Sequence, residues 1–277
     1  MNPTATTASD ARIFGAIQRR DSEQLAIYLA ELDAAMPAAS LDKAASQITT
    51  ATAYSGLVSG DIDIVKALLA NKQVDPSMLD NGALIANTEA GRTEIVGLLL
   101  QDPRVDPLAE DGKALVIAAA HHNETMFQSL ITRIPASKTW DPTLPLAIAA
   151  RNGSIKIADL IVNTLSSKPT PEQRVRINMA LVFAAEKGVP DIVKAILSIK
   201  DVNPKFSNDA AYLVAFKNSN TEAMQLLLET GRVKHEDHFA DSYRHPMIDL
   251  ELADPKWWVP LTTGALKFYS QVVNLQY

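Results

Sequence analysis

The side chains best suited to metal chemistry gather near the C-terminal end of the sequence. His235, His238, Asp241 and His245 include three of the five histidines and lie within eleven residues. On a single helix they would share one face and could ligate zinc. The alternative is a solvated polar loop, because Pro246 follows at once and interrupts any helix there.

No other catalytic or metal-binding pattern is present. The chain has no cysteine, which excludes disulfides, thiolate zinc sites and a cysteine nucleophile. It also lacks a Gly-rich phosphate loop and the HExxH and GxSxG motifs. We therefore predict no catalytic residue, no cofactor and no bound metal, with the histidines in a polar loop, and we do not expect an enzyme.

Composition limits the partners that the chain could bind. A net charge of -6 without any run of Lys or Arg argues against nucleic acid. The longest apolar run, residues 114–120, is far too short to span a membrane. The first ten residues lack the basic start and apolar stretch of a secretory signal peptide. We expect a soluble monomer, either cytoplasmic or delivered into a host cell without such a signal.

An internal repeat defines the elements that would position a binding site. Residues 60–69, 91–100 and 188–197 share the pattern Gly-x-x-x-Ile-Val-x-x-(Leu/Ile)-Leu. Weaker copies begin at His122, Gly153 and Ser219, and a degenerate one at Arg20. The first residues of the copies, here called the anchors, recur about every 31 residues, with longer intervals only from 20 to 60 and from 153 to 188. Such a period predicts stacked structural units.

Each unit is predicted to contain two short helices. The first ends at the anchor, over residues 83–91, 114–122, 145–153, 180–188 and 211–219. Leu84, Leu115, Leu146 and Leu181 share one position, and Ala118, Ala149, Ala184 and Ala215 share another on the same helical face. Glycine at the anchor suits a left-handed turn. After the second helix, the Val-Asp-Pro and Val-Asn-Pro connectors at 74–76, 105–107 and 202–204 stop the helix.

This unit resembles the ankyrin repeat. The likeness rests on Leu-x-x-Ala-Ala followed by Gly-x-x-x-Ile-Val-x-x-Leu-Leu, and it covers roughly residues 50–235. The Asp-Pro-Arg-Val-Asp-Pro connector at 102–107 is similar to the 31-residue subtype found in giant viruses, amoebae and amoeba-associated bacteria. The usual Thr-Pro-Leu-His start is absent. The resemblance implies an all-α helix-pair solenoid; HEAT and TPR arrays, which have longer periods, are the alternatives.

The termini and insertions depart from the repeat. We predict a helical N-terminal cap with an irregular insertion (1–50), in which residues 12–29 form the cap, then the array (51–235) and a C-terminal cap (236–277). The four extra residues around 166–171 are expected in a loop. Trp257, Trp258, Phe268 and Tyr269 would pack over the last helix pair, or alternatively form an aromatic binding site.

Ankyrin-like arrays bind partners through the face made by their first helices. Two residues after the recurring Leu, a position expected on that face reads Ala86, Ile117, Ile148, Phe183 and Val214. This position is either an exposed apolar stripe or buried in a tighter array. Beside it we expect a charged rim at Glu89, Ala120, Arg151, Glu186 and Lys217, then Ala90, His121, Asn152, Lys187 and Asn218.

The predicted partner-binding residues are Ile117, Ile148, Arg151, Phe183, Lys187 and Val214. Of these, Phe183 and Arg151 are expected to be the main contact residues of the interface. The expected function is protein–protein interaction, as a scaffold, adaptor or inhibitor. The subtype resemblance implies a narrower version, a bacterial effector acting on a host protein. Two alternatives stay open: an enzyme whose site forms between the C-terminal segment and the array, and a structural protein that self-assembles through the apolar stripe.

Overall fold

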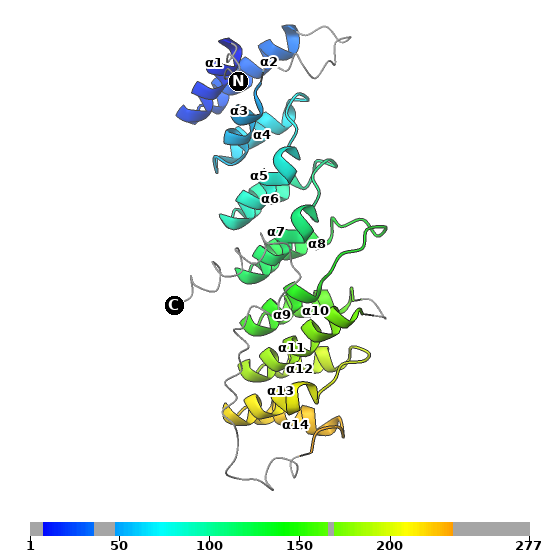
Figure 1. Cartoon of the computed structure of the whole chain (residues 1–277). Coiled ribbons are helices and arrows are strands. Elements are labelled where there is room, and N and C mark those ends of the chain that lie inside the picture. Colours follow the sequence, from blue (N-terminus) through cyan, green and yellow to red (C-terminus); the bar gives the residue numbers. More distant parts are fainter. Residues whose placement is uncertain (1–7, 36–47, 166–168, 235–277) are drawn as a thin grey trace, which may run out of the picture. The chain divides into compact units, whose positions relative to one another are not determined.

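The described part of the chain is entirely helical. The computed structural model describes residues 8–35, 48–165 and 169–234, in which there are fourteen helices and no strand (Figure 1). This confirms the all-α prediction. None of the described helices is both long and apolar enough to cross a membrane. The helices are α1 (Ala8–Arg19), α2 (Ser22–Ala35), α3 (Thr50–Leu57), α4 (Ile62–Ala70), α5 (Met78–Glu89), α6 (Thr93–Leu99), α7 (Ala109–Ala120), α8 (Glu124–Ile131), α9 (Thr143–Asn152), α10 (Ile155–Val162), α11 (Pro171–Lys187), α12 (Pro190–Leu197), α13 (Phe206–Lys217) and α14 (Thr221–Glu229).

Two compact units divide the chain, unit 1 (Met1–Trp140) and unit 2 (Asp141–Tyr277), with the boundary inside the region predicted as one array. In unit 1, α1, α3, α5 and α7 each pack on the helix that follows them. These first helices also contact one another in succession, and the second helices α2, α4, α6 and α8 do the same. Unit 2 repeats the arrangement with α9, α11 and α13 as first helices and α10, α12 and α14 as second helices. Each unit is therefore two layers of helices.

The recurring aliphatic positions form the core. The recurring Leu is buried in α5, α7, α9 and α11, and the Ala three residues later is buried in α7, α9, α11 and α13; Asn87 takes its place in α5 and is also buried. In the last pair Tyr212 replaces the Leu and is also buried, which raises the pKa of its phenol through desolvation. On the second helices, the Ile-Val pair and the following Leu or Ile are fully buried. The predicted core positions are confirmed.

The anchors all adopt the left-handed conformation. Their φ angles are 55° at Arg20, 81° at Gly60, 69° at Gly91, 53° at His122, 78° at Gly153, 73° at Gly188 and 58° at Ser219. The glycine prediction is confirmed, and the turn persists where the anchor is not glycine. The backbone therefore repeats more faithfully than the side chains do.

A second left-handed turn lies inside three of the first helices, α5, α7 and α13, one residue after the start of each. Residues 79–81, 110–112 and 207–209 each contain three consecutive residues at positive φ. The Asp-Asn-Gly and Glu-Asp-Gly sequences at 80–82 and 110–112 are typical of turns, although they do not specify the hand of the turn. Such a conformation strains residues that carry a Cβ, and most of these residues do.

The segment around 166–171 is not wholly a loop, because α11 begins at Pro171 and runs for 17 residues. The Thr170 hydroxyl accepts a hydrogen bond from the Gln173 N–H (3.2 Å), and the Gln173 side chain accepts one from the Thr170 N–H (2.9 Å). This capping box, with proline in the first turn, starts a helix. The expected first helix at 180–188 is thus only its C-terminal half.

Candidate partner-binding surface

The six predicted partner-binding residues all lie on first helices. Ile117 is on α7 in unit 1, whereas the other five are in unit 2. Ile148 and Arg151 lie on α9, Phe183 and Lys187 on α11, and Val214 on α13. Because α11 contacts both α9 and α13, these residues of unit 2 come from neighbouring helices.

The apolar stripe is buried. Ile117 is 0% exposed, Ile148 8%, Phe183 5% and Val214 6%, and only the small Ala86 is partly exposed. The exposed-stripe interpretation is therefore wrong, and the position is buried at these four residues. The physical reason is that α9 is buried at every residue from Thr143 to Ala150 and α11 from Arg176 to Ala185, so these helices have no open apolar face. The stripe can therefore affect binding of a partner only indirectly, by setting how the first helices pack together.

The rim is exposed, as expected. Glu89, Arg151, Glu186 and Lys217 project into solvent at the ends of their helices. At the neighbouring position the exposed residues are Ala90, His121, Lys187 and Asn218. Asn152 is half-buried and Ala120 is buried. Of the predicted partner-binding residues, Arg151 and Lys187 are therefore the two that a partner could touch.

Arg151 and Phe183 are in contact with each other. The guanidinium carbon of Arg151, on α9, lies 5.9 Å from the centre of the Phe183 ring, on α11. A cation near an aromatic ring at this distance gains about 0.5–1 kcal/mol at an exposed site. Arg151 and Phe183, predicted as two separate contact residues for a partner, are thus one structural pair. In it the buried ring positions the exposed cation.

A polar clamp holds α9 against α11 in the same unit. Arg176, 8% exposed, donates from Nε to the Thr143 hydroxyl (2.8 Å) and from Nη2 to the Asp141 carboxylate. The other oxygen of that carboxylate accepts from the N–H (3.0 Å) and the hydroxyl (2.6 Å) of Thr143. Partial burial opposes ionisation of Asp141, but the bonds from Thr143 and Arg176 outweigh it and lower its pKa. Because Asp141, Thr143 and Arg176 bond to one another, we assign this clamp a structural role, the positioning of α9 and α11.

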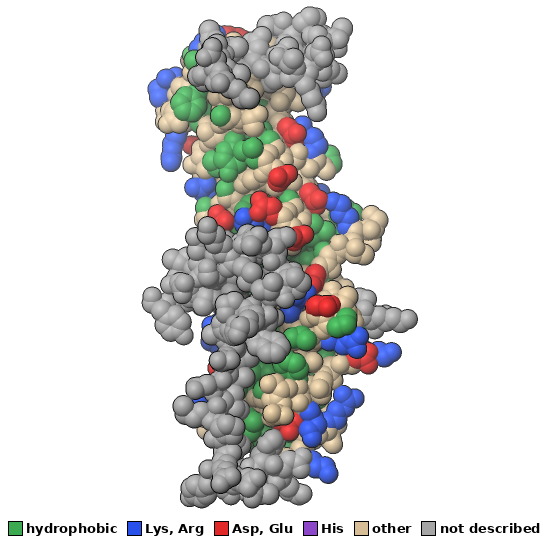
Figure 2. All heavy atoms as spheres, in the orientation of Figure 1, with side chains coloured by type: hydrophobic (Ala, Val, Ile, Leu, Met, Phe, Trp, Pro, Cys, Tyr) green, Lys and Arg blue, Asp and Glu red, His purple; other side chains and the backbone are tan. Residues whose placement is uncertain are grey.

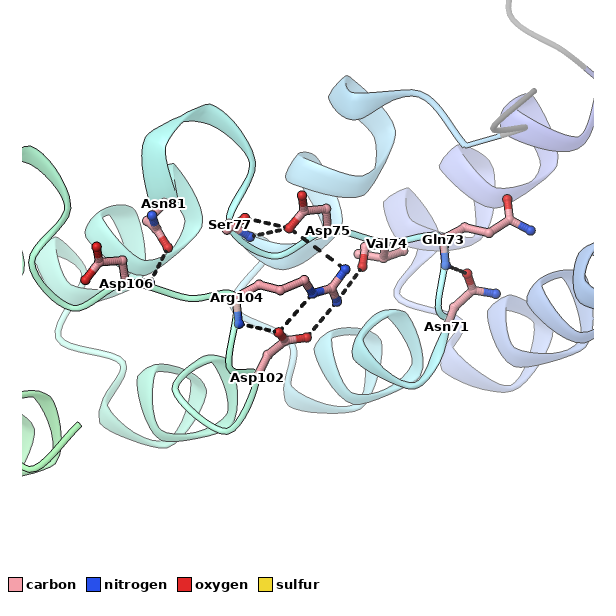
Figure 3. Close-up of polar contacts among 9 residues, drawn as sticks. All are labelled: Asn71, Gln73, Val74, Asp75, Ser77, Asn81, Asp102, Arg104 and Asp106. Atoms are coloured by element: carbon pink, nitrogen blue, oxygen red, sulfur yellow. Dashed lines mark hydrogen bonds and ion pairs between the residues drawn. The ribbon is translucent and has the colours of Figure 1, made fainter. Parts of the chain in front are cut away.

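The connectors of unit 1 hold a second polar set (Figure 3). Arg104 donates from Nε and Nη2 to the two oxygens of Asp102 (2.9 and 2.6 Å), and Nη2 also reaches the Val74 carbonyl of the preceding repeat (3.0 Å). The Arg104 hydrogen bond is the main reason that the pKa of Asp102 is lowered. Asp106 donates its N–H to the Asn81 side chain (2.8 Å) and pairs with Lys138 (2.5 Å). These carboxylates are engaged in structural contacts.

Phe216 is a surface residue that sequence reasoning missed. It lies on α13 beside Lys217 and is 47% exposed. The same position holds small residues in α5, α7, α9 and α11 (Thr88, Ala119, Ala150 and Ala185) and Leu57 in α3, and all five are buried. A phenylalanine cannot fit a space made for alanine, so this substitution in the repeat was the available signal.

The described residues contain no group of three or more His, Cys, Asp or Glu arranged to hold a metal ion. The predicted loop or zinc site at His235, His238, Asp241 and His245 lies outside the described residues. The same holds for Trp257, Trp258, Phe268 and Tyr269 of the expected C-terminal cap.

The chain matches no family model and no curated protein.

Proposed function

We propose that the chain is an ankyrin-like helix-pair solenoid and that it works by binding another protein. Support for a regular repeat comes from one hydrogen bond that recurs in both units. The Asn81 side chain accepts from the Asp106 N–H (2.8 Å), and the equivalent Asn178 accepts from the Asn203 N–H (2.9 Å). The left-handed anchors and the pairing of successive helices are further support.

The observation that carries the binding proposal is a contrast within the first helices of unit 2, α9, α11 and α13. Most residues in the C-terminal half of each helix are buried, while exposed residues near its end differ from one helix to the next. In unit 2 these residues are Arg151, Glu186, Lys187, Phe216 and Lys217. A uniform framework that presents different charged and aromatic side chains suits recognition of one protein surface. Charge on such a rim chiefly sets specificity and association rate.

The proposed mechanism is non-covalent. Arg151, positioned by the Phe183 ring, and Lys187 would contact carboxylates of the partner, while the buried helices keep the spacing of the rim constant. Scaffold, adaptor and inhibitor are the roles that such binding serves. The resemblance of the connector to the 31-residue subtype motivates the narrower proposal of an effector that acts on a host protein.

The test compares capture of a partner from a host-cell lysate by the wild type and by a rim variant. Lys187→Glu with Lys217→Glu reverses two exposed charges on α11 and α13. The matched control, Arg174→Glu with Lys194→Glu, reverses two exposed charges elsewhere on α11 and α12. We expect the rim variant to lose a protein that the control retains, with unchanged circular dichroism. Equal retention by both variants would rule out the rim as the binding surface.

A further inference from the structure

Three connectors share one local turn. In each, the side chain of the residue eleven positions after the anchor accepts a hydrogen bond from the backbone N–H two residues later. The pairs are Asn71 with Gln73 (2.9 Å), Asp102 with Arg104 (2.9 Å) and Thr230 with Arg232 (3.3 Å). Because the turn is the same, the side chains at its two ends can be compared directly.

Arg104 and Arg232 occupy the same position and make the same contact with the preceding repeat. Arg104 donates to the Val74 carbonyl and Arg232 to the Val202 carbonyl, both at 3.0 Å. Each bond ties a guanidinium to the connector of the preceding repeat, through Nη2 in Arg104 (Figure 3) and through Nη1 in Arg232. A guanidinium held in this way loses little entropy when it binds a carboxylate.

Among the described residues, Arg104 has a carboxylate partner and Arg232 has none. Asp102 takes the Nε and Nη2 donors of Arg104 in a two-pronged ion pair. At the equivalent position before Arg232 stands Thr230, and among the ion pairs of the described residues none involves Arg232. The chain therefore shows at Arg104 what ligand this geometry accepts, and at Arg232 the same geometry without that ligand.

The surroundings of Arg232 are also more basic than those of Arg104. The connector position held by Asp75 and Asp106 in unit 1 is taken by Asn203 and Lys234 in unit 2. Lys200 lies two residues before Val202, and both lysines are exposed. Figure 2 shows Lys and Arg side chains along the connector edge of unit 2. The local charge is therefore positive although the whole chain carries -6.

We propose that Lys200, Arg232 and Lys234, here called the Arg232 site, bind an acidic peptide segment of a partner protein, with one carboxylate on Arg232 as Asp102 is on Arg104. An isolated carboxylate fits better than a nucleic acid backbone, because the exposed carboxylates of Asp201 and Glu229 flank the site and would repel a dense polyanion. The inference rests on the proposed function in taking the ligand to be a protein segment, but it concerns the connectors and not the rim.

The experiment is a titration of the ¹⁵N-labelled full-length chain at low salt, following the Nε–H resonance of Arg232. The probe is a capped peptide of alternating Gly and Glu, and the matched probe replaces every Glu by Gln. We expect saturable shifts with the Glu peptide only. Arg232→Gln should weaken binding by about tenfold or more, whereas Arg174→Gln should leave it unchanged.

Two reciprocal variants separate ligand binding from folding. Thr230→Asp supplies the carboxylate that Asp102 supplies to Arg104, so it should abolish peptide binding while the protein stays folded. Asp102→Thr with Asp75→Asn removes both carboxylates that pair with Arg104 and should create a second peptide site there. The rim variant Lys187→Glu with Lys217→Glu should bind the peptide like the wild type, so failure of the rim proposal and of this one are distinguishable.

Several outcomes would overturn the proposal. One is equal binding of the Gln peptide, and another is unchanged binding by Thr230→Asp. A third is a thymidine oligonucleotide that shifts the Arg232 resonance where the Glu peptide does not, which would make the site one for nucleic acid. A fourth is peptide binding that is seen only in the variant Glu236→Gln with Asp237→Asn. That result would mean that the chain's own carboxylates occupy the site in the wild type.

Discussion

The guanidinium of Arg151 lies over the ring of Phe183, which joins a surface cation on α9 to a buried aromatic on α11. Polar contacts fix the same two helices near their other ends through Asp141, Thr143 and Arg176. Helix α9 is therefore held to α11 at two places, one near each of its ends. The stability of this part of unit 2 and the geometry of the rim depend on the same contacts.

Phe183→Ala should destabilise the protein strongly. The ring is 5% exposed, and truncating a buried phenylalanine costs about 3–5 kcal/mol. The sequence left open whether this ring is exposed or buried, and its burial sets the cost. Urea denaturation measures the loss. A double-mutant cycle with Arg151→Met should give a coupling of about 0.5–1 kcal/mol, and additive effects would show that the ring and cation do not interact.

Arg176→Met should destabilise unit 2 and weaken its pH dependence. Removing one partner of a fully buried ion pair costs about 3–5 kcal/mol. Here we expect about 2 kcal/mol, because the Asp141 side chain is 40% exposed and partly screened.

The sign of the pH effect follows from the lowered pKa of Asp141. A carboxyl whose pKa is lower in the folded state stabilises the fold above its unfolded pKa of about 4. That stability is lost as the pH falls through the folded pKa. Urea midpoints measured from neutral pH down into this acid range should fall further for the wild type than for Arg176→Met. If the urea midpoints of the two proteins fell in parallel with decreasing pH, the clamp would not be the source of the pH dependence.

Gly188→Ala should cost more than Gly91→Ala although both glycines have positive φ. At Gly91 an added Cβ meets nothing within 4 Å, so only the left-handed backbone is penalised, by about 1 kcal/mol. At Gly188 the Cβ would lie 2.5 Å from Oδ1 of Asn220, whose amide donates to the Ala185 and Glu186 carbonyls. We expect about 2–3 kcal/mol there, since at least one of those bonds is lost as well.

Thermal unfolding of the two variants gives the comparison. As a control, Asn220→Ala in the Gly188→Ala background should cost less than it does in the wild type, because the clash has already displaced the amide. Equal losses for the two glycine variants would show that the contact with Asn220 is unimportant.

Leu79→Gly should stabilise the protein. Leu79 is 59% exposed and has a φ of 54°, so it strains the backbone while burying little surface. Glycine relieves the strain, and after its own entropy cost the net gain should be about 0.5–1 kcal/mol. Ile155→Gly, at an exposed position in the ordinary helix α10, is the control and should destabilise by about 1 kcal/mol. A lower melting temperature for Leu79→Gly would contradict a left-handed turn at 79–81.

The recurrence of the anchors could be read from the sequence because it depends on local rules. Gly60 and Gly188 permit a left-handed turn, the prolines of the connectors stop each second helix, and the 3.6-residue period marks the buried Leu and Ile positions. Each rule acts over a few residues, so the order of residues is sufficient. The start of α11 at Pro171 also follows from a local rule. Thr170 and Gln173 form a capping box, and this pattern is present in the sequence although it was not used to predict the helix.

Contacts between helices decided the rest. Whether Phe183 faces solvent depends on how closely α9 and α11 approach, and the pattern along α11 alone is the same in either case. Arg151 meets Phe183, and Arg232 meets Val202, only because segments about 30 residues apart pack side by side. A single helix specifies which face is apolar, but burial is the area that its neighbours remove from water, and that is settled only when the layers are assembled.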